Sequence, residues 1–466
     1  MPEYRQNCNC STKISLRGII VSLADTFFVQ NFGCRASQAD GAALHAGLAA
    51  HGWHPAETRH SAGLVILNTC TVTASADYDV RQTIRRVHRE NPAARILVTG
   101  CYAQRAPEDL ADLPGVEWVV GNSHKPEIVD LLNQAEPYHG RVLVGDIFAR
   151  KDLPVFPILD AGPDRVRPNL KIQDGCHNRC AFCVIPFVRG GNRFVPADQV
   201  IAQMRALAQR YREVVLTGIN LGRWGREAGS TLRLVDLLRR ILDETPIERI
   251  RISSIEPMDL LDELLELIAA SPRIAQHVHA PLQSGSDAIL RRMHRKYRPR
   301  HYADRVEKAR RLMPDAAIGA DVMTGFPGET DALFEESRAF IEAMPFTYLH
   351  VFTYSERPGT KAVTLDGAVP VEIRRERNRI LRELGEAKNR AFRQRLAGRT
   401  FSAVTLEQPR TALTTNFLQV QLDRDMPPNQ LIDVVTQTSV CAVIESLHDQ
   451  VADSRRRTAR AGRAGN

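Results

Sequence analysis

Three cysteines lie close together in the middle of the chain, and they restrict what this region can fold around more than any other feature. Cys176, Cys180 and Cys183 fall inside the eight-residue stretch CHNRCAFC. Iron–sulfur clusters bind thiolate more readily than other protein ligands, and a four-iron cluster needs four ligands. Three cysteines would leave one iron open. Substrates and cofactors bind at an open metal position, whereas a structural site is closed by its own protein.

A zinc site is the alternative to an iron–sulfur cluster at this loop. His177 directly follows Cys176, so the three cysteines and this histidine could supply four zinc ligands. Adjacent Cys and His side chains can hardly both reach one tetrahedral ion at ordinary zinc–ligand distances. The stretch therefore favours a cluster with an open iron, and an RNA-binding zinc protein is the rival from another class.

The spacing of the three cysteines resembles that of the radical S-adenosylmethionine enzymes. Three residues separate the first pair and two the second, and the aromatic Phe182 precedes the last cysteine. In that superfamily the open iron binds the amino and carboxylate groups of S-adenosylmethionine. Electron transfer from the cluster then breaks a carbon–sulfur bond and gives a 5′-deoxyadenosyl radical. The resemblance implies the same cofactors here.

The composition is that of a protein with several globular domains and no membrane span. The chain has 466 residues, 43% hydrophobic and 25% charged, and no apolar run approaches the ~18 residues that a span needs. Residues 1–26 lack a basic start and a full apolar core, so we read them as an extension of unknown role. Nine cysteines, odd in number and clustered, indicate a reducing cytoplasm. The net charge of +8 permits nucleic-acid binding without requiring it.

Residues 27–150 alternate strands with helices, the pattern of an open parallel α/β domain. Three apolar segments, FFVQNFGC, LVILNTC and ILVTGC, end at Cys34, Cys70 and Cys101, and helical stretches such as residues 38–51 and 79–90 separate them. Parallel strands have their carboxyl ends at one edge, so we expect the three cysteines, each one step beyond a strand, to converge. They are either buried core cysteines or ligands of a second cluster, and their shared position favours the cluster.

With this domain included, most of the chain resembles the methylthiotransferases, in which an N-terminal domain precedes a radical S-adenosylmethionine domain. The resemblance implies an auxiliary four-iron cluster at Cys34, Cys70 and Cys101. The segment NFGCRASQAD is similar to the Gly-Cys-Arg form of the branch that acts on threonylcarbamoyladenosine in tRNA. The isopentenyladenosine branch more often has Cys-Gln-Met-Asn there, and the ribosomal-protein branch Gly-Cys-Pro-Lys. Arg35 is thus the main branch marker, while Ser37 and Asp40 depart from the Asn and Glu common in that branch.

A proline-rich linker, residues 151–168, precedes six predicted strand–helix units within residues 169–398, where a long helix follows the last unit. The predicted strands are residues 169–173, 214–220, 249–257, 277–283, 318–326 and 348–354. Amphipathic helical stretches lie between them, at residues 200–211, 259–270, 302–312 and 333–342. Six units rather than eight predict an incomplete (β/α)6 barrel, in which functional groups sit at the carboxyl ends of the strands.

The segments that follow these strands resemble family segments that face the cofactor cavity. On that resemblance the candidate S-adenosylmethionine-binding residues are Gly218, Asn220, Ser254, Glu256, Gln283 and Asp321. Residues of this kind also occur in plain turns.

The C-terminal part combines basic helical segments with a small β-barrel. The helix over residues 372–399 carries ten basic and four acidic side chains, and residues 289–300 are also basic, so both are candidates for phosphate contact. Residues 399–448 predict a small β-barrel with four short strands, possibly RNA-binding, although Arg410 and Arg424 are outnumbered there by five acidic residues. Residues 449–466 form a basic tail that we expect to be disordered.

The sequence thus predicts an α/β protein of three domains that acts as a radical methylthiotransferase. On the resemblance it holds two [4Fe-4S] clusters, uses S-adenosyl-L-methionine, and adds a methylthio group to carbon 2 of threonylcarbamoyladenosine in tRNA. The alternatives within the family are isopentenyladenosine and a ribosomal-protein aspartate. A cobalamin-dependent radical enzyme usually carries Asp-x-His-x-x-Gly, which is absent here. We expect a cytoplasmic monomer that receives electrons from a donor such as flavodoxin or ferredoxin.

Overall fold

The computed structural model of the chain describes residues 25–133, 142–150, 153, 166–226, 231–437 and 441–447. The predicted tail lies outside these residues, and so do nearly all of the predicted N-terminal extension and most of the predicted linker. Within the described part, no helix is both long enough and apolar enough to cross a membrane.

The first part of the chain forms a six-stranded sheet in which every described pair of strands is parallel. Its strands, in spatial order, are β2 (His54–Pro55), β1 (Thr26–Asn31), β3 (Leu64–Thr69), β4 (Arg95–Gly100), β5 (Val116–Gly121) and β6 (Val142–Leu143). All six residues of β3 are buried, as expected for a strand covered on both faces. This confirms the predicted open parallel α/β fold.

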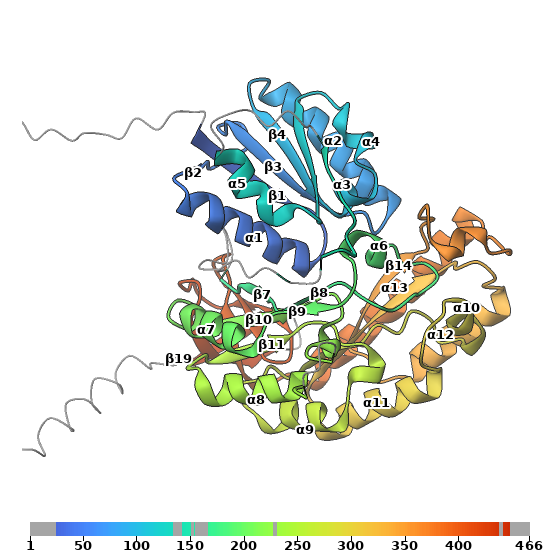
Figure 1. Cartoon of the computed structure of the whole chain (residues 1–466). Helices are drawn as coiled ribbons and strands as arrows, with labels where there is room; N and C mark the ends of the chain where they lie inside the picture. The colour runs from blue at the N-terminus through green and yellow to red at the C-terminus, as the bar shows by residue number, and fades with distance from the viewer. Residues whose placement is uncertain are drawn as a thin grey trace, which may run out of the picture.

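Helices cover both faces of this sheet (Figure 1). Alternate residues of β3 point to opposite faces: Leu64 and Ile66 pack with one group of helices, Val65 and Leu67 with the other. The helices are, on the first face, α1 (Arg35–Ala50) and α5 (Ile128–Asn133), and on the second, α2 (Ala74–Glu90), α3 (Cys101–Arg105) and α4 (Glu108–Ala111). Helix α1 also lies against β7 of the middle part of the chain (Figure 1).

The middle part contains six parallel strands in two groups of three. In spatial order they are β7 (Asn169–Lys171), β10 (Glu213–Thr217) and β11 (Arg249–Ile252), then β12 (His277–His279), β13 (Ala317–Thr324) and β14 (Tyr348–Thr353). A parallel bridge between Ile250 and Ile274 joins the groups just before β12. In the described part of the chain β7 and β14 are not paired, so the predicted incomplete barrel of six strands is confirmed and has a lateral opening between these two strands.

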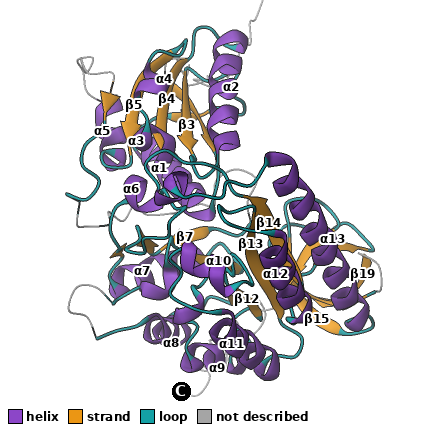
Figure 2. Ribbon diagram, turned by 90° about the vertical axis from the view of Figure 1, so that its right-hand side faces the viewer, coloured by secondary structure: helices purple, strands orange, loops and turns teal. Residues whose placement is uncertain are grey.

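Amphipathic helices surround this incomplete barrel (Figure 2). Helix α8 (Leu234–Glu244) shows why they pack there: Leu234, Leu237, Leu238 and Ile241 follow helical spacing, and all are buried in the barrel's core. The other main helices are α7 (Ala197–Ala208), α9 (Asp262–Ala270), α11 (Pro299–Leu312) and α12 (Asp331–Ala343), with the shorter α6 (Ile185–Arg189) and α10 (Asp287–Arg292) near the carboxyl ends of the strands.

The chain ends in the long helix α13 (Val371–Arg395), packed on β14, and a small closed β-barrel. The barrel's strands, in spatial order, are β15 (Thr400–Thr405), β16 (Thr411–Thr414), β17 (Gln419–Leu422), β19 (Cys441–Leu447) and β18 (Leu431–Thr436). The sequence predicted four strands and missed β16, because its four residues, TALT, carry too few apolar side chains to form a recognisable pattern. This barrel is fixed to the strands of the middle part, since Arg251 on β11 donates to the carbonyl of Thr414 at 3.0 Å.

Candidate functional site

The loop with Cys176, Cys180 and Cys183 lies between β8 (Gln173–Asp174) and α6. Gly175 turns the chain into this loop with a φ of +74°, and a Cβ there would lie 1.8 Å from the carbonyl oxygen of Gly191, so only glycine fits. All three cysteines are half-buried. Burial, followed by the neighbouring Cys180, raises the pKa of Cys183 to about 12, so its thiolate needs a nearby cation to form at neutral pH.

N–H groups surround the sulfurs of this loop as they surround cluster thiolates. The backbone N–H of Asn178 donates to the Cys176 sulfur at 3.3 Å, and the Asn220 amide lies 3.6 Å from the same atom. Arg295, which is 7% exposed, donates to the Cys180 sulfur at 3.1 Å. These donors fit a loop that holds an iron–sulfur cluster.

The positions of the sulfurs argue against zinc. Tetrahedral zinc with ligands at ~2.3 Å brings its sulfur ligands to within ~3.8 Å of one another. Among the described residues, one group of His, Cys, Asp or Glu side chains has its ligand atoms all within 4.8 Å of one another, and it contains no cysteine. The Nε2 atom of His177 instead lies against Gly191, 2.5 Å from the position that a Cβ would take there.

The second set of cysteines lies at the carboxyl edge of the N-terminal sheet. Cys70 directly follows β3, and Cys101 directly follows β4 as the first residue of α3. The sequence placed all three one step beyond a strand, which is wrong for Cys34: β1 ends at Asn31, and Phe32 and Gly33 intervene. The three nevertheless converge. Gly33, next to Cys34, packs on the Cys70 side chain, and the thiols of Cys34 and Cys101 both act electrostatically on Cys70.

These three thiols differ in exposure. Cys70 and Cys101 are buried and Cys34 is exposed. Burial, with Cys101 as the next cause, raises the pKa of Cys70 to about 12. The Cys101 sulfur is 3.3 Å from Nε of Arg189 and 3.6 Å from the amide of Asn122. Thiols kept together in this way, with N–H donors beside them, fit a second metal cluster better than a plain core.

Arg189 connects the two sets of cysteines. It ends α6, the helix that follows the first cysteine loop, and its side chain is 1% exposed. Besides the Cys101 sulfur, its guanidinium binds both carboxylate oxygens of Asp174 and one oxygen of Asp40, all at 3.1 Å. No local pattern indicates this role, since a single arginine after a cysteine loop looks like any surface cation.

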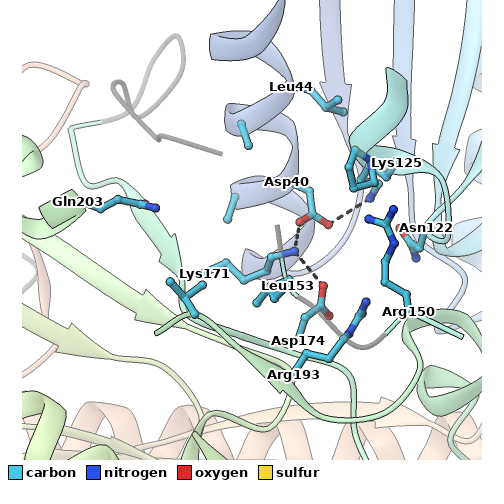
Figure 3. A pocket seen from close by; sticks show the side chains of 14 residues that line it. Asp40, Leu44, Asn122, Lys125, Arg150, Leu153, Lys171, Asp174, Arg193 and Gln203 are labelled. Atoms are coloured by element: carbon cyan, nitrogen blue, oxygen red, sulfur yellow. Dashed lines mark hydrogen bonds and ion pairs between the residues drawn. The ribbon is translucent and has the colours of Figure 1, made fainter. Parts of the chain in front are cut away.

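Asp40 and Asp174 belong to a buried network of charged side chains with Lys125 and Lys171 (Figure 3). Lys171 binds both carboxylates, and Lys125 donates to Asp40 at 3.1 Å. Burial alone would raise the pKa of Asp40, but the ammonium groups of Lys125 and Lys171 hold it well below its usual range. Burial would also raise the pKa of Asp174, but Arg189 and Lys171 hold it well below its usual range. Both aspartates are therefore charged at neutral pH.

Three of the predicted cofactor-binding residues lie beside the first cysteine loop. A Cβ at Gly218 would lie 2.7 Å from the side-chain oxygen of Gln173, which accepts a hydrogen bond from the backbone N–H of Asn220 at 2.6 Å. Glu256 forms an ion pair with Arg295, the donor to Cys180. The buried side-chain oxygen of Asn220 has no hydrogen-bond partner within the described part of the chain, so it is available to a ligand.

The other three predicted residues lie further along the barrel's inner surface. Ser254 contacts Nδ1 of His279 at 2.6 Å, and Asp321 lies 3.4 Å from Nε2 of the same ring. Gln283 has a φ of +67°, and its buried side-chain oxygen lacks a partner among described residues. The structure thus places Ser254 and Asp321 against a histidine rather than against the cysteine loop. All six remain proposed cofactor contacts.

Sequence reasoning missed a cluster of histidine and aromatic rings inside the incomplete barrel, which we call the ring chamber. His277 stacks on Phe417 of the small barrel with ring centroids 4.2 Å apart, and its Nε2 is 2.7 Å from the hydroxyl of Tyr348. His279 and His350 lie beside them with centroids 5.1 Å apart. Burial, with Arg251 as the next cause, lowers the pKa of His277 well below its usual value, so that ring is neutral. The alternation His-Val-His in one strand was the available signal, because it sends both rings to the same face.

The basic segment 289–300 is not a continuous surface, which corrects its prediction as a phosphate-binding face. Arg295 is buried against Cys180 and Glu256, and Tyr297 is 1% exposed. Arg298 forms an ion pair with Asp287 at 3.0 Å. The position of Arg295 could not be read from the sequence, because its partners are up to 115 residues away along the chain.

Two family profiles match the chain in separate places. The Radical SAM superfamily matches residues 170–341, and Uncharacterized protein family UPF0004 matches residues 26–121. The first contains Cys176, Cys180 and Cys183, and the second contains Cys34, Cys70 and Cys101.

Curated proteins match most of the chain. "Threonylcarbamoyladenosine tRNA methylthiotransferase MtaB" of Aquifex aeolicus (strain VF5) is 38% identical over 408 residues, which are 87% of this chain and 98% of that protein. The Bacillus subtilis (strain 168) protein of the same name is 37% identical and covers 76% of this chain and 78% of its own length. A "tRNA-2-methylthio-N(6)-dimethylallyladenosine synthase" of Syntrophobacter fumaroxidans (strain DSM 10017 / MPOB) is 34% identical, with 74% and 77% covered.

Among solved structures, the radical S-adenosylmethionine methyltransferase TsrM from Kitasatospora setae has a similar fold. Its TM-score is 0.55 at 16% sequence identity, and the match covers 72% of this chain and 76% of TsrM. At this identity the likeness shows the fold alone.

Proposed function

The chain belongs to the radical S-adenosylmethionine methylthiotransferases, in the branch of the MtaB relatives, and we propose that it adds a methylthio group to carbon 2 of N6-threonylcarbamoyladenosine in tRNA. The observation that carries the proposal is the pair of separate three-cysteine sets, each with N–H donors at its sulfurs and joined through Arg189. One set serves radical formation and the other the transfer of sulfur.

The chemistry explains why the site is built around metal clusters instead of an acid–base pair. The hydrogen on carbon 2 of adenine is not acidic enough for any side chain to remove it at neutral pH. A four-iron cluster with S-adenosylmethionine supplies, when bound, a radical that can abstract such a hydrogen. Cys176, Cys180 and Cys183 would hold this cluster, with Arg295 donating to the Cys180 sulfur.

The second set would hold the auxiliary cluster, and the base would lie at the ring chamber inside the incomplete barrel. Arg189 fixes the orientation of Cys101 relative to the first loop, because it is anchored to Asp174 just before that loop. His277, Tyr348 and Phe417 present ring faces that suit a planar base and exclude water from it.

Mass spectrometry of tRNA tests the reaction directly. The reconstituted protein is incubated with S-adenosylmethionine, a reductant and tRNA that carries threonylcarbamoyladenosine. We expect the nucleoside to gain the mass of a methylthio group in place of hydrogen. Matched substrates with isopentenyladenosine, or a ribosomal protein, should remain unmodified. A methylthio group found on either of these, with none on threonylcarbamoyladenosine, would move the chain to another branch of its family.

The tRNA contacts are expected along the groove between β14 and α13. His350, Arg382, Asn389 and Arg390 line this groove, which runs beside the lateral opening of the barrel. Arg393 and Arg395, which the sequence also suggested, donate instead to the carbonyl oxygens of Gln419 and Pro314.

Changing Arg382 and Arg390 together to glutamine should weaken tRNA binding and reduce its salt dependence. Removing one cation from a phosphate lowers the slope of log K against log salt by about one, so the double change should lower it by about two. The matched control is the double change of Arg410 and Arg424 in the small barrel, where Arg410 already pairs with Asp425. A larger effect of the control pair in the salt titration would place the RNA on the small barrel.

The remaining expectations concern the protein's surroundings. We propose a cytoplasmic location, where tRNA is modified and thiols stay reduced. The electron donor, such as flavodoxin or ferredoxin, and the monomeric state stay predictions.

A further inference from the structure

Arg35 is a half-buried cation whose guanidinium has no hydrogen bond or ion pair with any other described residue. It is the first residue of α1, and the chain reaches it directly after Cys34. Burial lowers its pKa, and Arg167 and Arg251 lower it further, although an arginine remains charged. Charges withdrawn from water are normally paired, and no described residue of the chain supplies a partner for this one.

Arg35 lies at the lateral opening of the incomplete barrel. Helix α1 packs on β7, at one edge of the opening, and Gln38 on α1 binds Asn169 at 3.1 Å. On the other side, Arg35 acts electrostatically on Tyr348 of β14, the opposite edge strand, and on His277 inside the chamber. The guanidinium is therefore close to the ring-lined chamber between the two unpaired edges.

Positive charge exceeds negative charge at this point. Glu213 is the carboxylate that acts on Arg35, and three other arginines already bind it. These are Arg167 at 3.2 Å, Arg249 at 3.7 Å and Arg251 at 2.8 Å. Glu213 has no exposed surface and cannot turn toward Arg35. Asp321, which like Arg35 acts on Tyr348, lies against His279 and His350 instead. Among the described residues the group therefore keeps a net positive charge, which an anionic ligand would balance.

We propose that Arg35 binds the carboxylate of the threonylcarbamoyl group and so selects an adenosine with an acidic side chain over an unmodified or isopentenyl one. This inference rests on the function proposed above. A guanidinium can bind a carboxylate through two parallel hydrogen bonds, which gives direction as well as strength.

The position of Arg35 explains how this contact would also orient the base. The threonylcarbamoyl group on N6 and the reacting carbon 2 flank the same ring nitrogen of adenine. Arg35 adjoins Cys34, a proposed ligand of the auxiliary cluster. An anion held by Arg35 would therefore place carbon 2 toward the second set of cysteines. The phosphates of tRNA belong to the outer backbone, so they are a less suitable partner for a cation beside a chamber of rings.

Equilibrium binding of three anticodon stem-loop RNAs tests the proposal with the reconstituted protein. The RNAs are identical except for adenosine, threonylcarbamoyladenosine or isopentenyladenosine beside the anticodon. A charge-assisted pair predicts that the wild-type protein binds the acidic nucleoside about ten- to a hundredfold more tightly than plain adenosine. In Arg35→Gln that preference should disappear while binding of the adenosine RNA stays unchanged. Arg35→Lys keeps the positive charge but loses the paired N–H donors of the guanidinium, so it should retain part of the preference.

The controls separate the possible failures. Arg239→Gln, an exposed arginine on α8, should leave the preference intact, and iron content checks that each Arg35 variant still carries its clusters. An Arg35→Gln protein that loses affinity for all three RNAs equally would show a phosphate contact and overturn the proposal. A variant that keeps the full preference would overturn it as well. A wild-type protein that prefers isopentenyladenosine would instead refute the proposed function itself.

Discussion

Replacing Cys176, Cys180 and Cys183 together by alanine is expected to remove half of the iron from the reconstituted protein and to abolish cleavage of S-adenosylmethionine. Two four-iron clusters give about eight irons per chain, and the triple variant should hold about four. Cleavage should stop because the remaining cysteines, which follow strands of the N-terminal sheet, lack the spacing that resembles the radical S-adenosylmethionine enzymes. Iron and sulfide analysis and the yield of 5′-deoxyadenosine are the measurements.

Two cysteine controls make this result specific. Changing Cys34, Cys70 and Cys101 together should also remove half of the iron, yet leave some cleavage of the cofactor and no methylthio transfer. Changing Cys8 and Cys10, which belong to neither set, should leave the iron content unchanged. Equal cleavage by the two triple variants would refute the division of roles between the clusters.

Local patterns were enough to predict most of the fold. The six barrel strands and the helices between them follow from short apolar segments and helical periodicity, as in α8 with Leu234, Leu238 and Ile241. The convergence of Cys70 and Cys101 followed from topology alone, since the carboxyl ends of parallel strands share an edge. Cys34 was misplaced by two residues because an apolar phenylalanine, Phe32, extends the apparent strand beyond its last pair.

The charged parts of the site could not be predicted, because their meaning depends on distant partners. Arg189 and Arg295 have the sequence surroundings of surface cations, yet each is buried with a cysteine sulfur as one partner. The ring chamber combines His277 with Phe417, 140 positions later in the chain. Such contacts arise only when the small barrel docks on the strands of the middle part, which no local pattern encodes.

Arg189→Met is expected to destabilise the protein by about 3 to 5 kcal/mol at neutral pH, the usual cost of removing one partner from a buried ion network. The methionine would fill much of the space but leave Asp40 with the two lysines, and Asp174 with Lys171 and the more weakly acting Arg193, as counter-charges. We also expect partial loss of iron, because Cys101 loses one of its two N–H donors. The unfolding midpoint and the iron content of the reconstituted variant are the readouts. Arg240→Met, which breaks an exposed ion pair with Glu244, is the matched control and should change little.

The pH dependence of this loss identifies the carboxylates as its cause. Asp40 and Asp174 have lowered pKa values in the folded protein, so the stability they contribute is present above the unfolded pKa of ~3.9 and is lost as pH falls toward their folded values. Without Arg189 the folded pKa values of both aspartates rise toward the unfolded value. The stability that depends on their ionisation is then smaller, so less is lost when they are protonated. The difference in unfolding midpoint between wild type and Arg189→Met should therefore be largest near neutral pH and shrink below pH ~4. Adding Asp174→Asn, which removes a carboxylate that has lost its arginine partner, should restore part of the stability at neutral pH. A difference that is the same at every pH, with no rescue by the asparagine, would mean that Arg189 stabilises the protein by packing alone.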